Sequence, residues 1–370
     1  MKNIKVLLLL TFLLTTSVNI SFAQEETEEA TFSFSGSVDT YFRQNITAPN
    51  KPVDGAAPGS SFANTPGFAL GMVNLIATGE KGNVGFTADL GFGPKGADAV
   101  FLSTGSSSIV NQLFAYWNVS DKVTLTMGNF NTFLGYEVIS PTANFNYSTS
   151  YMFSNGPFSH TGLKADIALT DNFSAMLGIL NPTDYTDYNP FGTYSLGAQL
   201  GYSNDAGSAY LNFVYGDQDG TLNTRTASMG DESSGATFQV DLTTGWDVSD
   251  QFYVGFNGTY NTTSSGEFFD GNVQDMDGDA AGFLGSALYL QYAASDAASV
   301  GIRGEYFQTY VGDATADITA ITLTGKFGVG PLTLIPEIRF DTSSEDIFID
   351  TDYMPTGSLA SFVLAAVYGF

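Results

Sequence analysis

The sequence predicts an all-β protein, a membrane-spanning antiparallel up-and-down β-barrel of about 16 strands with short turns at one end and long loops at the other. Segments of alternating apolar and polar residues recur along the chain, and this pattern is typical of strands with one apolar and one polar face. Most segments have roughly the 9–11 residues that a tilted membrane strand needs. Their connections are alternately short and long, which is the asymmetry of an outer-membrane barrel.

The composition excludes several classes of protein. The 370 residues contain 12 Lys+Arg against 38 Asp+Glu, a net charge of −26, with one His and no Cys. Without cysteine there is no disulfide scaffold, thiolate zinc site or thiol nucleophile. The scarcity of Lys and Arg argues against a nucleic-acid partner. We expect no metal centre and no cofactor.

The first element is a predicted signal peptide, residues 1–23. Lys2 and Lys5 precede a short apolar segment at 6–14, and Ser21-Phe22-Ala23 offers small residues for cleavage after Ala23. Residues 24–370 are then a single predicted outer-membrane β-barrel domain. The predicted location is the outer membrane of a Gram-negative cell.

The first predicted strand, residues 32–43, shows the pattern that defines the others. Phe34, Val38 and Phe42 have one parity, whereas Asp39 and Arg43 have the other. The remaining strands follow at residues 67–78, 83–93, 110–119, 122–130, 158–169, 172–180, 193–202, 207–215, 236–246, 251–261, 282–292, 299–308, 317–327, 331–340 and 357–370.

The connections orient the predicted barrel. An even number of strands places both termini at the short-turn side, which is periplasmic in such barrels, and leaves the long loops extracellular. Short turns are predicted at residues 79–82, 120–121, 170–171, 203–206, 247–250, 293–298 and 328–330. Long loops are predicted at residues 44–66, 94–109, 131–157, 181–192, 216–235, 262–281, 309–316 and 341–356.

A soluble β-sandwich or solenoid could share the alternation, but two features favour the membrane. The last strand carries apolar residues on one parity and ends in the aromatic Phe370, like strands that are recognised for outer-membrane assembly. Aromatic residues also lie near strand ends, as in the interfacial girdles of barrels. These are Tyr41, Phe42, Trp117, Phe130, Tyr202, Tyr215, Trp246, Tyr260, Tyr292 and Tyr368.

The middle of the chain resembles a known family. Residues 128–163, with the motifs at 128–130, 135–137, 144–151 and 157–163, are similar to the signature region of the OmpL-like putative β-barrel porin family. Residues 37–41 and 110–118 fit the same family. The resemblance implies an outer-membrane channel.

A barrel of 16 to 18 strands leaves an aqueous channel, so function depends on what narrows it. The longest predicted loop, residues 131–157, is rich in aromatic residues, and exposing their apolar surface to water would be unfavourable. We expect it to fold into the lumen as a constriction loop, with its rings either packed on the wall or forming a stacking track for sugars. The constriction residues are Tyr136, Glu137, Phe145, Tyr147 and Tyr151.

Strand parity also predicts charged residues that line the pore. Closure would bring four of the bases onto neighbouring strands, as one basic wall. Either salt bridges among these groups stiffen the barrel, with Glu305 and Glu337 alternating with Arg303 and Arg339, or the wall faces Glu137 and orients dipolar solutes. The pore-lining bases are Arg43, Lys164, Arg303, Lys326 and Arg339; the acids are Asp39, Asp89, Asp166, Asp241, Glu305 and Glu337.

Neither of two further motifs predicts an enzyme. His160 has no local nucleophile signature, so we predict no catalytic residues and give the imidazole a hydrogen-bonding role at the neighbouring loop. Residues 275–279 have acidic spacing but lack the glycine and glutamate positions of an EF-hand. Whether the acidic loops share divalent cations with lipopolysaccharide stays open.

The sequence therefore predicts an outer-membrane porin, a passive diffusion channel for small hydrophilic solutes. The alternative is a non-transporting barrel that acts as an adhesin or structural protein through its acidic loops. The expected partners are outer-membrane lipid and lipopolysaccharide, the barrel assembly machinery and small hydrophilic solutes. A homotrimer is left open, as are the solute, the ion selectivity and the gating.

Overall fold

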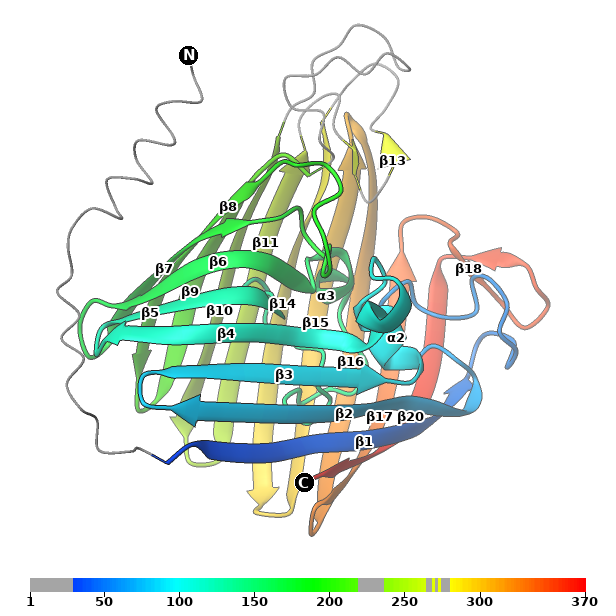
Figure 1. The fold of residues 1–370 in the computed structure, drawn as a ribbon. Coiled ribbons are helices and arrows are strands. Elements are labelled where there is room, and N and C mark those ends of the chain that lie inside the picture. The colour runs from blue at the N-terminus through cyan, green and yellow to red at the C-terminus, as the bar shows by residue number, and fades with distance from the viewer. Residues whose placement is uncertain (1–28, 219–235, 264–267, 270–271, 274–279) are drawn as a thin grey trace, which may run out of the picture.

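The computed structural model describes residues 29–218, 236–263, 268–269, 272–273 and 280–370. Sixteen of its strands form one closed antiparallel barrel in which every strand pairs with its neighbours in the chain (Figure 1). This confirms the predicted fold class. The predicted signal peptide, residues 1–23, and the acidic motif at 275–279 lie outside the described residues.

The barrel strands extend the alternation that the sequence predicts, and several are longer at the end with long loops. They are β1 (Thr31–Asn45), β2 (Gly67–Lys81), β3 (Val84–Phe92), β4 (Val110–Ser120), β5 (Val123–Asn131), β6 (Ser159–Ala168), β7 (Phe173–Leu180), β8 (Ser195–Asn204), β9 (Gly207–Gly216), β10 (Thr237–Ser249), β11 (Phe252–Thr263), β14 (Ala281–Ser295), β15 (Ala298–Val311), β16 (Ala314–Val329), β17 (Leu332–Ser343) and β20 (Ser358–Gly369).

The barrel closes between its first and last strands. β1 pairs with β2 on one side and with β20 on the other. Beyond the end of β20, Gly36 N donates to Phe370 O and Phe370 N donates to Gly36 O, both at 3.0 Å. Each strand edge is therefore paired, as a strand in a bilayer requires.

Some sequence expectations are wrong in detail. The predicted long loop at residues 309–316 is a tight hairpin, because Gly312 adopts a positive φ of 55° and lets β15 turn directly into β16. Tyr41 and Phe130, expected in the outer aromatic girdle, are buried inside the barrel, since they share the parity of the inward residues.

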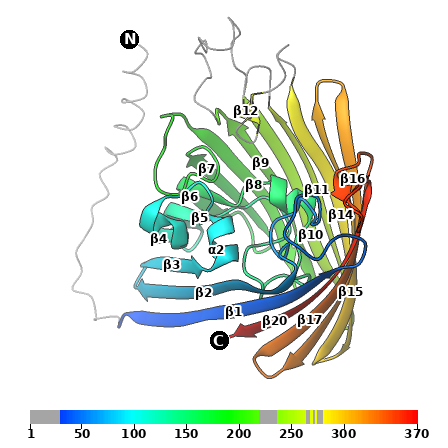
Figure 2. The same ribbon diagram turned by 90° about the vertical axis from the view of Figure 1, so that its right-hand side faces the viewer.

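The long connections contain elements that alternation does not reveal. These are the helix α2 (Pro94–Ala99), the 3₁₀ helix η1 (Gly105–Ile109), the helix α3 (Tyr151–Asn155) and the two-residue strands β12 (Phe268–Phe269), β13 (Asn272–Val273), β18 (Phe348–Ile349) and β19 (Pro355–Thr356). α2 begins with a proline, whose φ suits the first helical turn. Both α2 and α3 lie within the ring of strands (Figure 2). Among the described residues, no helix has the length and apolar character to cross a membrane.

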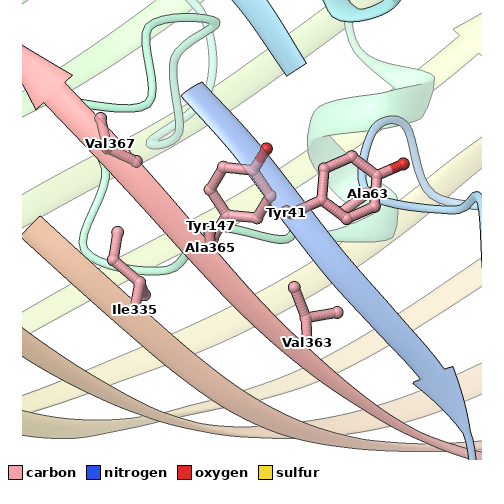
Figure 3. Close-up of a cluster of buried hydrophobic side chains, with 7 residues drawn as sticks. All are labelled: Tyr41, Ala63, Tyr147, Ile335, Val363, Ala365 and Val367. Atoms are coloured by element: carbon pink, nitrogen blue, oxygen red, sulfur yellow. The ribbon is translucent and has the colours of Figure 1, made fainter. Parts of the chain in front are cut away.

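The inner face is packed rather than empty. Figure 3 shows one cluster in which Tyr41 of β1 and Tyr147 of the loop after β5 lie beside Val363 and Ala365 of β20. The two tyrosine rings have their centroids 5.7 Å apart. The barrel core is thus built from wall residues and inserted loops together.

Candidate functional site

The loop of residues 131–157 crosses the barrel interior. It leaves β5 and returns to β6 where Asn131 pairs with Ser159. On the far wall, Tyr147 Oη donates to Asp39 of β1 at 2.6 Å, and Tyr151 Oη donates to Asp341 of β17 at 3.0 Å. Both tyrosines are only 2% exposed. The loop therefore divides the lumen instead of covering its mouth.

Carboxylates of the wall hold the backbone of this loop. They accept hydrogen bonds from peptide N–H groups, and such charge-assisted bonds are stronger than neutral ones. Glu337 accepts from the N–H groups of Tyr147 (2.7 Å) and Ser148 (2.9 Å), Glu305 accepts from those of Tyr151 (3.1 Å) and Met152 (2.9 Å), and Asp241 accepts from that of Gly135 (2.9 Å).

Bases of the wall bind carbonyl oxygens in the same segment of loop. They donate from Arg303 to Ser148 O at 2.7 Å, from Arg339 to Thr149 O at 2.8 Å and from Lys326 to Asn144 O at 2.9 Å. Arg43 instead donates to Ala63 O of the first long loop, at 3.2 Å. Consecutive peptide groups are thus satisfied by side chains, as buried irregular backbone requires.

The predicted pore-lining bases all lie on inward parity, but they do not share one environment. Arg43, Arg303 and Arg339 are at most 2% exposed and lie beneath the loops. Lys164, on β6, pairs with Asp166 at 2.7 Å, and both remain partly exposed. The Lys164–Asp166 pair is therefore more accessible to solvent in the lumen than the three guanidinium groups.

The ion pairs differ from the predicted alternation. Arg303 pairs with Glu137 of the loop at 2.5 Å, and Arg339 pairs with Asp341 at 2.9 Å. Glu305 and Glu337 instead accept from loop N–H groups. Of the two predicted arrangements, the salt bridges of Glu305 and Glu337 to Arg303 and Arg339 are therefore not found, whereas Arg303 does face Glu137, as the other has it. A guanidinium has five donors in a fixed fork and can serve a carboxylate and a carbonyl together, which parity cannot reveal.

The buried and partly buried charges around residues 137–152 of the loop balance. Five basic residues carry five positive charges and five acidic residues carry five negative charges at neutral pH. The bases are Arg43, Lys95, Arg303, Lys326 and Arg339, and the acids are Asp39, Glu137, Glu305, Glu337 and Asp341. Apart from Lys95, these ions are paired or hydrogen-bonded, as buried charge requires, so the set holds this segment in place without a net charge; Asp241, at Gly135, lies outside it.

Two other inward carboxylates are held by amides rather than by bases. Asp89 accepts from Asn74, from Asn111 at 2.7 Å and from Gln112 at 3.1 Å. Asp241 accepts from Asn212 at 3.0 Å and Asn257 at 2.6 Å. Within the described part of the chain neither has an ion-pair partner, so each adds an uncompensated negative charge to the interior.

Asp241 is expected to contribute to cation preference. Charges beside a narrow passage are weakly screened, so Asp241→Asn should move the reversal potential in a KCl gradient by several millivolts toward anions. Asp171→Asn, in an exposed turn, is the matched control and should leave it unchanged. Equal reversal potentials for wild type and Asp241→Asn would place the ion path elsewhere.

The aromatic rings of the loop pack against the barrel wall. Two of them, those of Phe145 and Tyr136, lie over glycines on the inward face of the wall. A Cβ on Gly301 would come 2.5 Å from the Phe145 ring, and a Cβ on Gly255 would come 2.6 Å from Tyr136 Oη. Tyr136 also stacks on Tyr289, with centroids 4.1 Å apart. The sequence does not identify these glycines or Tyr289 as site residues, because the loop ring that each of them contacts lies far away along the chain.

Three internal cavities adjoin the loop. A cavity of about 10 Å³, room for roughly one water, lies between the loop and the wall at Asp241 and Asn257. On the short-turn side of the loop are two larger cavities of about 380 and 430 Å³. A wide space therefore remains on the short-turn side of the loop.

Lys95 of α2 is a buried base that sequence parity did not find. Its Nζ has no hydrogen-bond partner within the described residues and lies 4.8 Å from the centre of the Phe62 ring and 5.2 Å from that of Tyr147. Burial lowers the pKa of Lys95 to about 8, against the raising effect of Asp39, Glu337 and Glu137. The protonated form of Lys95 is therefore less favourable in the folded protein than in water.

The Lys95 pKa predicts an alkaline stabilisation. Because the folded pKa lies below the ordinary value, the unfolded chain binds the proton more strongly, and the free energy of unfolding rises between pH 8 and 10.5 by about 3 kcal/mol. Lys95→Met should abolish this rise, measured from the heating temperature that unfolds the barrel on SDS gels. Lys122→Met, at an exposed turn, is the control; the same pH rise in both variants would contradict the assignment.

His160 is buried against the loop base. Its Nε2 lies 3.0 Å from Thr132 Oγ1, and its ring lies 4.9 Å from that of Phe133. These contacts tether the start of the loop to β6. Among the described residues, no group of three His, Cys, Asp or Glu is placed to hold a metal ion.

Comparison with known proteins gives a family and several similar folds. A family model described as "Putative beta-barrel porin-2, OmpL-like" matches residues 31–370. No curated protein sequence matches the chain.

The similar solved structures share the fold at low sequence identity. The OmpT of Vibrio cholerae is 10% identical, with a TM-score of 0.58 over 94% of this chain and 99% of that one. An in-vitro folded OmpT from the same organism, described as a trimer form, is 11% identical, with a TM-score of 0.59 over 93% and 100%. Pseudomonas putida OprB is 12% identical, with a TM-score of 0.56 over 92% and 94%.

Proposed function

The chain belongs to the OmpL-like putative beta-barrel porin-2 family, and on that premise we propose that it is a porin of the cell outer membrane, a passive diffusion channel for small hydrophilic solutes. One observation carries the proposal: a ring of 16 strands, wide enough for a channel, contains a loop whose backbone is fixed inside it. A fixed internal loop sets the size of what passes.

The test is single-channel recording after reconstitution into planar bilayers. Because the backbone of the loop is fixed across the lumen, we expect discrete steps of low conductance. A heat-modifiable, correctly folded protein that gives no steps would contradict the channel. Such a result would favour the second candidate.

That second candidate is a non-transporting barrel acting as an adhesin or structural protein. The loop that crosses the lumen from β5 to contacts on β1 and β17 favours it, since a barrel blocked by its own loop passes no solutes. In this case the long loops would be the working surface. A sealed barrel that binds a partner through those loops would establish it.

The remaining assignments also stand as proposals. We assign no catalytic role, and the contacts of His160 with Thr132 and Phe133 support a packing role for the imidazole. Partners would be outer-membrane lipid, lipopolysaccharide and the assembly machinery. The trimer form of one similar structure supports a homotrimer, which sedimentation of the detergent-solubilised protein would test.

A further inference from the structure

The two cavities on the short-turn side of the loop form one chamber. Their volumes are about 380 and 430 Å³, and they share four lining residues. Asp250, Gln251, Asp296 and Ala297, in the short turns after β10 and β14, line the outer part, so the chamber opens at the short-turn end. The shared residues are Phe145, Tyr253, Gln291 and Lys326.

Aromatic rings build one side of the chamber. Tyr136 stacks on Tyr289 with an interplanar angle of 20°, and its hydroxyl lies 2.7 Å from that of Tyr253. Phe145 sits over Gly301, with Lys326 Nζ 5.7 Å from the ring centre. These rings are held by fixed contacts, and Tyr136 and Phe145, which are half-buried, present their faces within a largely polar lining.

Several polar groups of the same chamber are unused. Tyr289 is 2% exposed, and its hydroxyl has no hydrogen-bond partner within the described chain. Gln291 lies two residues further on the same face of β14, and no side-chain hydrogen bond of its amide is found among the described residues. Lys326 donates to Asn144 O and has donors to spare. Gln291 and Lys326 are only partly buried, and an amide both donates and accepts, so this surface is suited to a ligand that does the same.

The charges of the chamber select against ions. An ammonium group, Lys326, lies where the two cavities meet and repels cations, and Glu137 of the inner cavity is neutralised by Arg303. Three carboxylates, Asp247, Asp250 and Asp296, lie at the opening, where they repel anions. A neutral solute meets neither penalty.

We propose that this chamber binds a neutral, polyhydroxylated solute, a short oligosaccharide. Sugar rings have an apolar face for the rings of Tyr136 and Phe145, and hydroxyl groups for Gln291 and Lys326. The volume is within the range of small-molecule sites. The biological role inferred for this site rests on the proposed porin function. Sugar binding itself can be measured whether or not the barrel conducts.

Calorimetric titration of the detergent-solubilised protein with maltotriose tests the proposal. Wild type should bind, and Gln291→Leu and Phe145→Ala should each weaken the affinity about tenfold, the effect of losing one good contact. Gln199→Leu makes the same change on the inward face of β8, outside the chamber, and should bind within about twofold of wild type.

Probes of other chemistry complete the test. Citrate, spermidine and zwitterionic triglycine should not bind. No heat with maltotriose, stronger binding of triglycine, or equal losses in Gln291→Leu and Gln199→Leu would overturn the proposal. Bilayer recordings separate it from the function: channels that conduct without sugar binding refute only the binding site, whereas sugar binding to a non-conducting barrel refutes only the channel.

Discussion

Replacing residues 136–153 with a short Gly-Ser linker is expected to raise the single-channel conductance several-fold. This segment carries the rings and peptide groups that fill the lumen, and the strands on either side of it remain paired through Asn131 and Ser159. A ring of 16 strands without an internal loop leaves an aqueous channel. Conductance in planar bilayers measures the effect.

The barrel itself should survive this deletion, because the strand hydrogen bonds do not involve the loop. The variant should still migrate faster before boiling than after it on SDS gels. Removal of the exposed residues 187–191, between β7 and β8, is the matched control and should leave conductance unchanged. Unchanged conductance in the loop variant would show that the loop does not limit passage.

Arg303→Met is expected to destabilise the protein by about 3–5 kcal/mol, the usual effect of removing one member of a buried ion pair. Arg303 is fully buried and bonds Glu137 of the loop at 2.5 Å and Ser148 O at 2.7 Å. Without it, Glu137 stays buried and unpaired. The unfolding temperature should fall and the current should become noisier as the loop loosens.

A double-mutant cycle isolates the pair. Arg303→Met with Glu137→Gln should recover part of the stability lost in Arg303→Met, because no uncompensated charge remains. If Arg303 acted mainly through a field on passing solutes, Arg303→Met would shift the reversal potential and leave stability unchanged. That outcome would contradict the conclusion that the Arg303–Glu137 ion pair holds the loop in place.

The fold follows from the sequence because barrel strands have a period of two. Parity placed Asp39, Arg303 and Glu337 on the inner face and Leu364 and Phe370 on the outer face, as the structure has them. Parity is also correct for Tyr41 and Phe130, which lie inside the barrel; their assignment to the outer aromatic girdle is wrong because it rests on aromatic character and position near a strand end. Alternation thus fixes which face a side chain uses, but not its partner on that face.

The contacts of the candidate site were not predictable in the same way. Glu305 and Glu337 bind peptide N–H groups about 150 to 190 positions away along the chain, and no local pattern specifies this pairing. The fit of Phe145 on Gly301 likewise exists only once the loop is inserted. Lys95 lies on a helix too short to give a periodic signal.

Disulfide trapping tests most directly that the loop is bound inside the barrel. The chain has no cysteine, and Asn146 Nδ2 donates to Thr324 Oγ1 of β16 at 2.6 Å. In the folded protein, the Asn146→Cys and Thr324→Cys pair should oxidise readily, and the bond should make the boiled, unreduced chain migrate faster. Asn146→Cys with Gln199→Cys, on β8, should not cross-link. Failure of the first pair to form a disulfide in a heat-modifiable barrel would contradict the internal loop.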